Sequence, residues 1–365
     1  MKKPLFPSYL RINNISLFSK SPLVFEVSLG RSNVTEEVIQ LKDYELYILS
    51  LSEGFFTVDE LREKTLKEFN CSLEEFYETF EQLKKVSLLI DGAENKAAMP
   101  NQDDRYARHM LFYESIGLNG SAIQEKIKAK KVAIIGAGGI GTWLSYNLSA
   151  SGVLDIKIID SDIIEESNLT RQVLYTTDDI GALKVDACKK RIEERNPNVK
   201  VTAIPMKIFS LEDMEKFVGD VDLILLAGDG PHEINLIINE YAYKKGIAWS
   251  RAGYHHQTAI CGPFLIPGES QCYECLTDLR TPQKNLPYVS EINSRYQTPS
   301  FGPVNGIAST LLAKEAICFL GGIDSWVVTN GKVSAFDAYS LESEIIEVDV
   351  DHNENCPHCS KHFSN

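Results

Sequence analysis

Apolar and polar residues follow two different periods along the larger part of the chain. Short, nearly unbroken apolar runs, typical of strands that are buried on both faces, alternate there with longer segments that have one apolar face, typical of amphipathic helices. The runs are 132–138, 155–162, 199–206, 221–229 and 247–254, and the helical segments are 140–152, 182–196 and 232–246. This α/β alternation predicts a Rossmann-like, mostly parallel sheet with helices on both faces. The region from 257 onwards adds further strands and a helix over 306–320.

The beginning of the chain has a different pattern. Two alternating runs predict short strands and three periodic segments predict helices, namely 10–18 and 23–30 for the strands and 43–54, 57–69 and 72–90 for the helices. Thr57 with Glu60 and Ser72 with Glu75 have the spacing of capping boxes at the starts of the second and third helix. Three short helices with flanking strands are the parts of a winged helix-turn-helix.

Winged helices usually read DNA, but the charge of this region argues against that use. Residues 1–100 contain 12 Lys and Arg against 16 Asp and Glu, and the third helix carries Glu74, Glu75, Glu78 and Glu81. An acidic recognition helix repels phosphate. We therefore predict that the region binds protein or peptide, with a plain structural addition as the alternative.

Composition divides the chain and limits its partners. We predict a winged-helix-like α+β domain over 1–95, a polar linker over 96–104 and an α/β domain over 105–365. The formal net charge of −14 argues against wholesale binding to nucleic acid or to an anionic membrane, because both need clustered Lys and Arg. No run of 18 apolar residues predicts a transmembrane helix, and prolines interrupt the basic N-terminus before a signal peptide could form. We expect a cytoplasmic protein whose eight cysteines stay reduced, as core residues or metal ligands.

The stretch 132–141 predicts a nucleotide-binding turn. Gly136, Gly138 and Gly141 form G-x-G-x-x-G between a strand and a helix, and Gly139 lies in the same turn. Glycines let the backbone approach phosphate, and the helix N-terminus offers N–H groups to the anion. Asp160 ends the next strand, from where a carboxylate holds ribose hydroxyls. These features alone leave open a dinucleotide for hydride transfer or ATP.

Charged residues around this turn favour ATP. A triphosphate with magnesium needs cations and a carboxylate for the metal. Arg171 follows the second strand on a loop with Asn168, Lys184 begins the next helix, and Asp229 ends the run 221–229. The carboxyl ends of parallel strands are where open α/β sheets bind ligands. The alternative for each residue is a solvated surface charge, or a helix cap in the case of Asp229.

Residues 104–360 resemble the adenylating enzymes related to the ubiquitin-activating enzyme (E1), the bacterial ThiF and MoeB group. The resemblance rests on RYARH, GAGGIG, DSDIIEESNLTRQ, the G-x-x-K turn, VDLILLAGD, AGYHHQTAICGPF and two Cys-x-x-Cys pairs. It implies an enzyme that uses ATP and Mg²⁺ to convert a polypeptide carboxylate into an acyl adenylate. It further implies that Asp160 holds ribose, with Asp162 beside it at the nucleotide, and that Asp229 binds Mg²⁺.

The resemblance also assigns cations and an oligomeric state. Asn168, Arg171 and Lys184 would contact the phosphates and offset the charge that develops at the α-phosphorus. Arg108 matches the arginine that such enzymes reach across a dimer to the partner's triphosphate. A homodimer with composite sites is therefore expected.

Four cysteines have the spacing of metal ligands. Cys272 and Cys275 form one pair and Cys356 and Cys359 another, 80 residues further on. Two such pairs that meet in space make a closed, structural four-thiolate site, and in this family they bind zinc. The alternative is four buried thiols, and His358 inside the second pair is left unassigned.

The remaining cysteines indicate no covalent relay. Cys71, Cys188, Cys261 and Cys318 lie in apolar or helical contexts and are predicted to be core residues. Family members that form thioesters carry a reactive cysteine after the first pair, and residues 276–303 contain none. The adenylate is therefore expected to go directly to its acceptor.

The hundred residues before RYARH narrow the resemblance to the subgroup that modifies small ribosomally made peptides. In this subgroup the N-terminal domain binds a precursor peptide and presents its carboxylate to ATP. We predict adenylation of such a peptide during natural-product (antibiotic) biosynthesis, followed by nucleotide transfer or by cyclisation within the peptide. The alternatives are adenylation of a sulfur-carrier protein, an NAD-dependent oxidoreductase and a non-catalytic peptide-binding scaffold.

Overall fold

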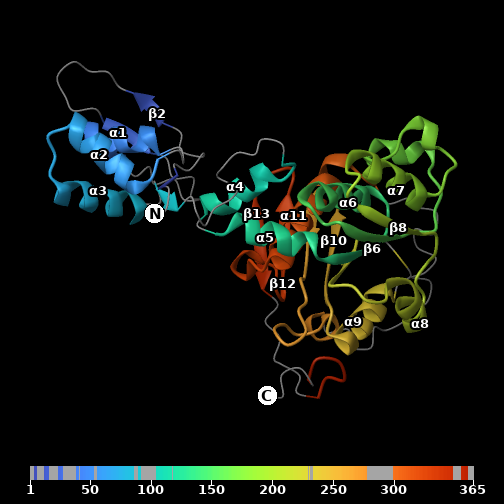
Figure 1. The fold of residues 1–365 in the computed structure, drawn as a ribbon. Helices are drawn as coiled ribbons and strands as arrows, with labels where there is room; N and C mark the ends of the chain where they lie inside the picture. The colour runs from blue at the N-terminus through green and yellow to red at the C-terminus, as the bar shows by residue number, and fades with distance from the viewer. Residues whose placement is uncertain are drawn as a thin grey trace. The chain divides into compact units, whose positions relative to one another are not determined.

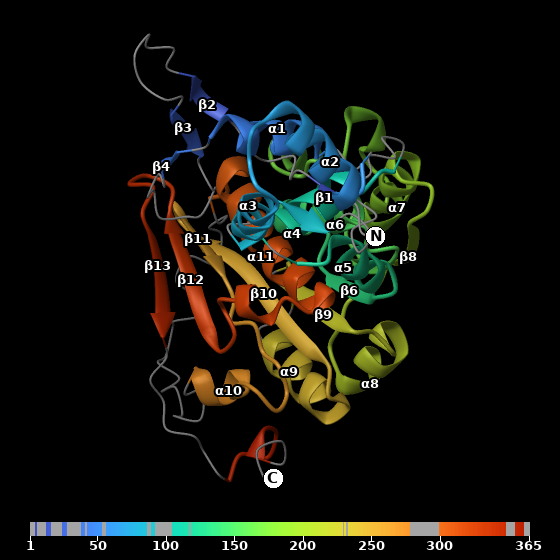
Figure 2. The ribbon, with the colours of Figure 1, turned by 60° about the vertical axis from the view of Figure 1, so that its left-hand side comes forward.

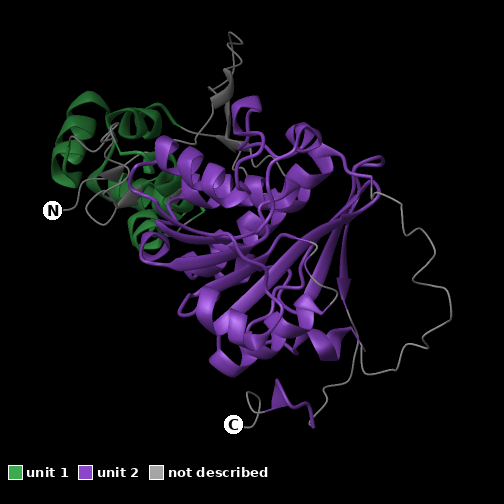
Figure 3. Ribbon diagram, turned by 90° about the vertical axis from the view of Figure 1, so that its right-hand side faces the viewer, with its two compact units in different colours: residues 1–125 green, residues 126–365 purple. Residues whose placement is uncertain are grey.

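Two compact units, Met1–Glu125 and Lys126–Asn365, make up the computed structural model (Figure 3). Each unit has an apolar core of its own. The structure describes residues 4–5, 12–15, 24–27, 38–40, 42–52, 56–85, 89–91, 104–116, 118–228, 230, 233–277, 299–347 and 355–360.

An eight-stranded sheet in the order β13-β12-β11-β10-β9-β6-β7-β8 is the centre of the second unit. The strands from β8 to β10 pair in parallel, and β11, β12 and β13 continue the sheet antiparallel beyond β10 (Figure 2). Their bounds are β6 Lys131–Ile135, β7 Asp155–Ile159, β8 Lys200–Ile204, β9 Leu223–Leu226, β10 Ala248–His255, β11 Thr258–Cys261, β12 Lys332–Asp337 and β13 Ser343–Glu347. The predicted Rossmann-like, mostly parallel sheet is thus confirmed.

Helices cover both faces of this sheet (Figure 1). The helices α6 (Gly139–Ser151), α7 (Lys184–Arg195) and α11 (Gly302–Gly321) lie on one face, and α9 (Ile234–Lys245) and the short α8 (Leu211–Asp213) lie on the other. The central strands β6 and β9 are buried almost throughout, as their apolar runs predict, whereas the edge strand β8 is mostly half-buried. Shorter helices are a π-helix at Met214–Val218, α10 at Tyr273–Leu276, and 3₁₀ turns at Glu166–Thr170, Thr177–Asp179 and Asp324–Trp326.

Among the described residues, α11 is the one helix whose length and composition would suffice for a membrane span. Of its most apolar 18-residue window, 61% is buried inside the protein, where α11 packs on α6 and on strands β10 and β11. These contacts are those of a core helix.

The parallel strands end together at one edge of the sheet. Ile159 of β7 pairs in register with Ile135 of β6, Ile135 with Leu226 of β9, and Leu226 with Arg251 of β10. The loops after β7, β6 and β9 therefore start side by side, and β10 passes the same edge and continues to His255. This edge is where open parallel sheets bind ligands.

The first unit combines short strands with helices, as predicted for an α+β domain. A three-stranded antiparallel sheet contains β2 (Ile12–Ile15), β3 (Val24–Val27) and β4 (Val38–Gln40), and β1 (Pro4–Leu5) pairs with β5 (Ile90–Asp91). The helices are α1 Asp43–Leu51, α2 Val58–Glu68, α3 Leu73–Lys85, α4 Ala107–Ser115 and α5 Gly120–Lys128, the last of which crosses the boundary between the units.

Both predicted capping boxes are present in this unit. The Thr57 hydroxyl accepts from the Glu60 N–H at 3.3 Å, and the Glu60 carboxylate accepts from the Thr57 N–H at 2.6 Å. Ser72 and Glu75 exchange the same pair of bonds at 3.1 and 2.7 Å. Because these bonds satisfy the first free N–H groups of α2 and α3, they fix where both helices begin.

Candidate functional site: a nucleotide cleft at the carboxyl edge of the sheet

The glycine turn joins β6 to α6 and needs glycine for two reasons. Gly136 has a φ of +104°, and a Cβ there would lie 2.7 Å from Gly228. A Cβ at Gly141 would lie 2.0 Å from the carbonyl oxygen of Gly136. Gly138 differs, because a Cβ there would meet no atom within 4 Å. The open side of the turn at Gly138 leaves room for a ligand at the N-terminus of α6.

Asp160 is fixed to this turn by backbone donors. Its carboxylate accepts from the Ala137 N–H at 2.7 Å and from the Asp162 N–H at 2.8 Å. These two bonds hold the end of β7 against the loop after β6. The carboxylate remains half-exposed at the cleft described below.

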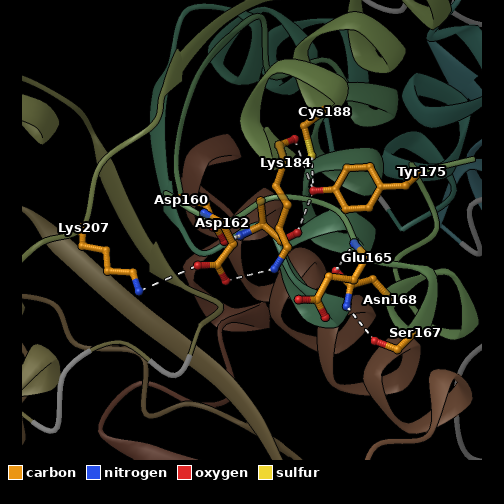
Figure 4. A network of polar contacts seen from close by, with 10 residues as sticks. Asp160, Asp162, Glu165, Ser167, Asn168, Tyr175, Lys184, Cys188 and Lys207 are labelled. Atoms are coloured by element: carbon orange, nitrogen blue, oxygen red, sulfur yellow. Dashed lines mark hydrogen bonds and ion pairs between the residues drawn. The ribbon is translucent and has the colours of Figure 1, made fainter. Parts of the chain in front are cut away.

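Lys184 lies buried at the first position of α7 and faces Asp162 (Figure 4). Its ammonium Nζ is 3.1 Å from the Asp162 carboxylate, and its N–H donates to the Asp162 carbonyl at 2.9 Å. Lys207 approaches the same carboxylate from the other side, at 3.8 Å. Two cations share one carboxylate that is itself 52% exposed, so the local charge favours an anion.

The loop between Asp162 and α7 holds Asn168 and Arg171. Asn168 is buried, and its Oδ1 accepts from the Glu165 N–H at 3.2 Å, which caps the 3₁₀ turn at Glu166–Thr170. Arg171 follows that turn and donates to the Ser167 carbonyl at 2.9 Å. The turn thus determines where the Arg171 side chain begins.

These elements surround a cleft of about 730 Å³. It brings together most of the predicted site residues and several others, including Gly136, Gly138, Gly139, Asp160, Asp162, Arg171, Gln172, Lys184, Lys207, Arg251 and Asn305. Gln172 is buried here, and its side-chain oxygen Oε1 has no hydrogen-bond partner in the part of the chain that the structure describes. A polar, cationic cleft with an unpartnered buried amide is suited to a polar, anionic ligand.

The other predicted site residues are placed differently. Asn168 and Gly141 support the cleft from behind and are not part of its lining. Asp229 lies outside the described residues, although Gly228 and Gly230 on either side of it line the cleft. Arg108 is exposed on α4 in the first unit.

Several residues of the site were missed from the sequence, among them Gln172, Asn305, Tyr175, Lys207 and Arg251. The buried Tyr175 hydroxyl donates to the Ala137 carbonyl at 2.7 Å and lies 3.3 Å from the Lys184 carbonyl and from Cys188 Sγ (Figure 4). Burial raises the pKa of Tyr175, so its hydroxyl stays a donor. The available signals were an aromatic residue in a polar loop and, for Arg251, a lone cation within an apolar strand.

A second site is the cluster of four cysteines predicted from their spacing. The sulfur atoms of Cys272, Cys275, Cys356 and Cys359 all lie within 4.8 Å of one another, and all four residues are buried. The Sγ atoms of Cys272 and Cys356 are 3.6 Å apart, and those of Cys275 and Cys359 are 3.7 Å apart. A tetrahedral zinc with bonds of about 2.3 Å separates its sulfurs by about 3.8 Å, so the cluster fits zinc.

The surroundings of the cluster influence its thiols. Burial raises the pKa of Cys272 to about 12 and also raises that of Cys275, because the thiolate loses its hydration. Burial acts on Cys356 in the same direction, but N–H groups of Cys359 and His358 lower its pKa to about 6. His358, unassigned from the sequence, lies 3.0 Å from the Glu274 carboxylate and so joins the two cysteine segments.

The other cysteines follow the prediction with one exception. Cys188, Cys261 and Cys318 are buried, and burial raises the pKa of each. Cys71 was predicted to be a core residue, which is wrong: it is half-buried in the turn between α2 and α3. Its position in this turn leaves the thiol partly accessible to solvent.

Comparisons with known proteins agree with this fold and cleft. The model of the ThiF family matches residues 106–358. A sulfur carrier protein adenylyltransferase from Thermus thermophilus is 32% identical over 260 residues, which cover 70% of this chain and 90% of that protein. The crystal structure of E. coli MccB with ATP is similar at a TM-score of 0.78 and 27% identity, over 99% of this chain and 100% of that one. The structure of PaaA is similar at a TM-score of 0.70 and 25% identity, over 89% and 96%.

The fold, the cleft and these similarities define an adenylyltransferase with an E1-like fold. The chain belongs to the ThiF family. The glycine turn alone is compatible with a dinucleotide or with ATP. The family and the ATP-bound MccB crystal favour ATP.

Proposed function

We propose that this enzyme adenylates a carboxylate of a ribosomally synthesised precursor peptide during the biosynthesis of a peptide natural product. The observation that carries the proposal is the extent of the similarity to MccB, which was crystallised with a nucleotide analogue and MccA and covers 98% of this chain. The sulfur-carrier relative covers 70%. The similarity to MccB therefore includes the N-terminal part of the chain, for which we propose the peptide-binding role, with domain bounds of 1–95, 96–104 and 105–365.

The cleft offers separate surroundings for each part of ATP. Asp160 would hold the ribose, and the apolar residues Met206, Ile208 and Phe209, which follow β8 and line the same side, suit an adenine ring. The open glycine turn and the cations Arg171 and Lys184 suit the phosphates.

The chemistry is an in-line displacement at phosphorus. A carboxylate oxygen of the peptide attacks the α-phosphorus, the bond from that phosphorus to the bridging oxygen breaks, and pyrophosphate leaves with the acyl adenylate as the other product. Lys184 and Arg171 would stabilise the charge that builds up on the phosphate oxygens. Asn168 would act by fixing the turn that carries Arg171.

Two ions and a second subunit complete the proposed enzyme. Asp229 would hold Mg²⁺, which supplies charge neutralisation for the triphosphate when bound. The four cysteines would hold a structural zinc. We infer a homodimer in which Arg108 reaches the partner's triphosphate, acting in the cytoplasm.

The fate of the adenylate has two forms, which use the same cleft. In one, an amide nitrogen formed from the activated peptide attacks the α-phosphorus of a second ATP, which releases pyrophosphate and leaves a peptide–nucleotide phosphoramidate. In the other, an internal nucleophile displaces AMP and closes a ring with net loss of water. The sequence between 276 and 303 contains no cysteine for a thioester relay. The second candidate function is adenylation of a sulfur-carrier protein, which the Thermus relative favours.

Peptide-dependent ATP–pyrophosphate exchange tests the proposal. The substrates are the peptides encoded by short open reading frames beside the gene and, in parallel, a small carrier protein that ends in Gly-Gly. Exchange with one of the peptides is expected, and mass spectrometry then separates a gain of a nucleotide from a loss of water. Exchange with the carrier protein alone would replace the proposal with the second candidate.

Asp229→Asn is the matched variant for this assay. Loss of the metal ligand should abolish pyrophosphate release. Peptide affinity, measured by fluorescence anisotropy, should stay within about three-fold of the wild-type value, a difference of about 0.65 kcal/mol in binding free energy. Normal turnover by the variant would show that the magnesium assignment is wrong.

A further inference from the structure

Arg251 occupies a distinctive position at the carboxyl edge of the sheet. Asp160 follows β7, the glycine turn follows β6, Gly228 follows β9, and Arg251 lies on the next strand, β10, in register with Leu226. Neighbouring strands are about 4.8 Å apart, so Arg251 is about 14 Å along the edge from the strand that carries the ribose-side aspartate. Arg251 and Asp160 therefore line the same cleft from strands that are three positions apart in the sheet.

The partners of Arg251 are all uncharged. Its NH1 nitrogen donates to the Asn235 side-chain oxygen at 3.1 Å and to the Tyr273 hydroxyl at 3.1 Å. No carboxylate pairs with Arg251 among the residues that the structure describes, whereas Lys184 and Lys207 share Asp162. Its NH2 nitrogen lies 3.9 Å from a Cβ built on Gly253, which also lines the cleft. The guanidinium is thus fixed at one nitrogen and keeps N–H donors for an anion.

Two kinds of anion are brought together in the proposed reaction, the phosphates and the carboxylate. The part of the cleft near β7 and β6 is lined by Lys184, Lys207 and the N-terminus of α6, which suit the phosphates. The cation of β10 lies beyond them along the same cleft, so a carboxylate held there would approach the α-phosphorus from the side opposite the leaving pyrophosphate. A planar fork of N–H groups matches a carboxylate, and holding one carboxylate oxygen leaves the other to attack.

We propose that Arg251 binds the carboxylate of the substrate that is adenylated, and that Tyr273 positions Arg251. This inference rests on the proposed function, because it names the residue that receives its substrate. Tyr273 is well suited to the role: its N–H donates to the Asn239 side chain at 2.8 Å, and its ring lies 5.6 Å from that of the buried Trp249. It also stands between Cys272 and Cys275, so the cysteine cluster fixes the backbone that presents its hydroxyl.

The test compares Arg251→Gln, Arg251→Lys and Tyr273→Phe in the full chain, by pyrophosphate exchange with the peptide that supports it. Loss of a charged hydrogen bond should raise KM for the peptide about 10- to 100-fold in Arg251→Gln, with KM for ATP within about three-fold. Arg251→Lys should recover part of the loss, because it restores the charge without the fork. Tyr273→Phe should raise KM for the peptide about three- to ten-fold without changing that for ATP.

Arg195→Gln is the matched control. Arg195 also donates to a tyrosine hydroxyl, that of Tyr146 at 3.2 Å, but it ends α7 and is absent from the lining of the cleft. Both KM values should match those of the wild type. Melting temperature and calorimetric binding of the ATP analogue AMPCPP verify that each variant is folded.

Three outcomes would overturn the inference. Weaker AMPCPP binding by Arg251→Gln would assign the residue to the phosphates, and this measurement needs no peptide. Unchanged KM for the peptide would show that Arg251 does not bind it, and a fall in kcat alone would assign Arg251 to the transition state and not to binding of the carboxylate. If only the Gly-Gly carrier protein supports exchange, the proposed function fails, and the same variants are compared on the carboxylate of that protein.

Discussion

Lys184 is the most deeply buried of the four cations that line the cleft, with 7% of its surface exposed. The only carboxylate within ion-pair distance of it in the described residues is Asp162, whose side chain is half-exposed. A buried ammonium interacts more strongly with a nearby anion than an exposed one does, since less water screens it. We therefore expect Lys184 to be the cation that would stabilise a phosphate oxygen in this cleft most strongly.

Replacing Lys184 with methionine keeps most of the side-chain volume and removes the charge. The rate of pyrophosphate exchange should fall by about 10²- to 10³-fold, the usual cost of removing one donor to a developing oxyanion. Lys189→Met on the same helix is the control, because Lys189 is half-buried outside the lining of the cleft and pairs with Glu193 at 3.1 Å. An exchange rate for Lys184→Met equal to that of Lys189→Met would contradict the role of Lys184.

Among the residues of the site, the sequence predicted those whose positions depend on the order of strands and helices. It missed those whose roles depend on contacts that form only in the folded chain. Asp160 comes directly after β7, Lys184 begins α7 and Arg171 lies on the loop between them, so the rule about carboxyl ends found all three. Tyr175 acts through a hydroxyl that meets Ala137 only in the folded chain. Arg251 stands within a strand, where a single cation gives no sign of its neighbours.

Among the connecting elements, the loop between β7 and α7 is fastened to its helix by one carboxylate. Asp179 is buried, accepts from the N–H and the hydroxyl of Thr176, both at 2.9 Å, and receives Arg191 of α7 at 2.9 Å. Burial opposes ionisation of Asp179, but the donors from Thr176 and Arg191 outweigh it and lower its pKa. The loop that carries Arg171 is thereby held to the helix that carries Lys184.

Asp179→Asn should lower the free energy of unfolding by about 1.5–3 kcal/mol at pH 7, the range for hydrogen bonds to a charged group. Because the folded-state pKa is depressed, the stabilisation is fully present above the unfolded pKa of about 4 and is lost as the pH falls through the folded value. The difference in melting temperature between wild type and variant should therefore shrink below about pH 4. Asp178→Asn, at the exposed neighbouring position, should show no such difference at any pH.

Strongly periodic elements were predicted well and the irregular ones were not. The five parallel strands correspond to short, nearly unbroken apolar runs, and a buried strand accounts for such a run better than any other kind of element does. The helical segment from Leu211 to Val218 was missed, because one short α-helical turn continues there into a π-helix and gives no 3.6-residue pattern. A signal existed in the cap: the Ser210 hydroxyl accepts from the Asp213 N–H at 3.1 Å.

For the molecule as a whole, the four-cysteine cluster joins two segments of the second unit that are distant in sequence. Cys272 and Cys356 are 84 positions apart, and the segment 355–360 is tied to α10 by two sulfur pairs and by His358 with Glu274. Sequence spacing predicted the set of four, since two Cys-x-x-Cys pairs have few other uses. It could not predict that the tyrosine between the first two would reach Arg251.

Cys356→Ser should remove the metal. Inductively coupled plasma mass spectrometry should find about one zinc per wild-type chain and less than a tenth of that in the variant, since a structural site requires its full set of four ligands. The melting temperature should fall as well, because binding free energy at such a site is folding free energy. Cys318→Ser, which changes a buried thiol outside the cluster, should keep its zinc. Equal zinc in both variants would mean that the cluster is only four buried thiols.

The position of Cys356 and Cys359 also gives assembly an order in time. A chain leaves the ribosome N-terminal end first, so the glycine turn, Lys184 and every strand through Glu347 emerge before the second cysteine pair does. Tyr273 and Arg251 are synthesised early, yet the cluster that fixes Tyr273 closes only when residues 355–360 have been added. A nascent chain whose sheet strands have all been synthesised therefore still lacks the cysteine cluster that fixes Tyr273, the residue proposed to position Arg251.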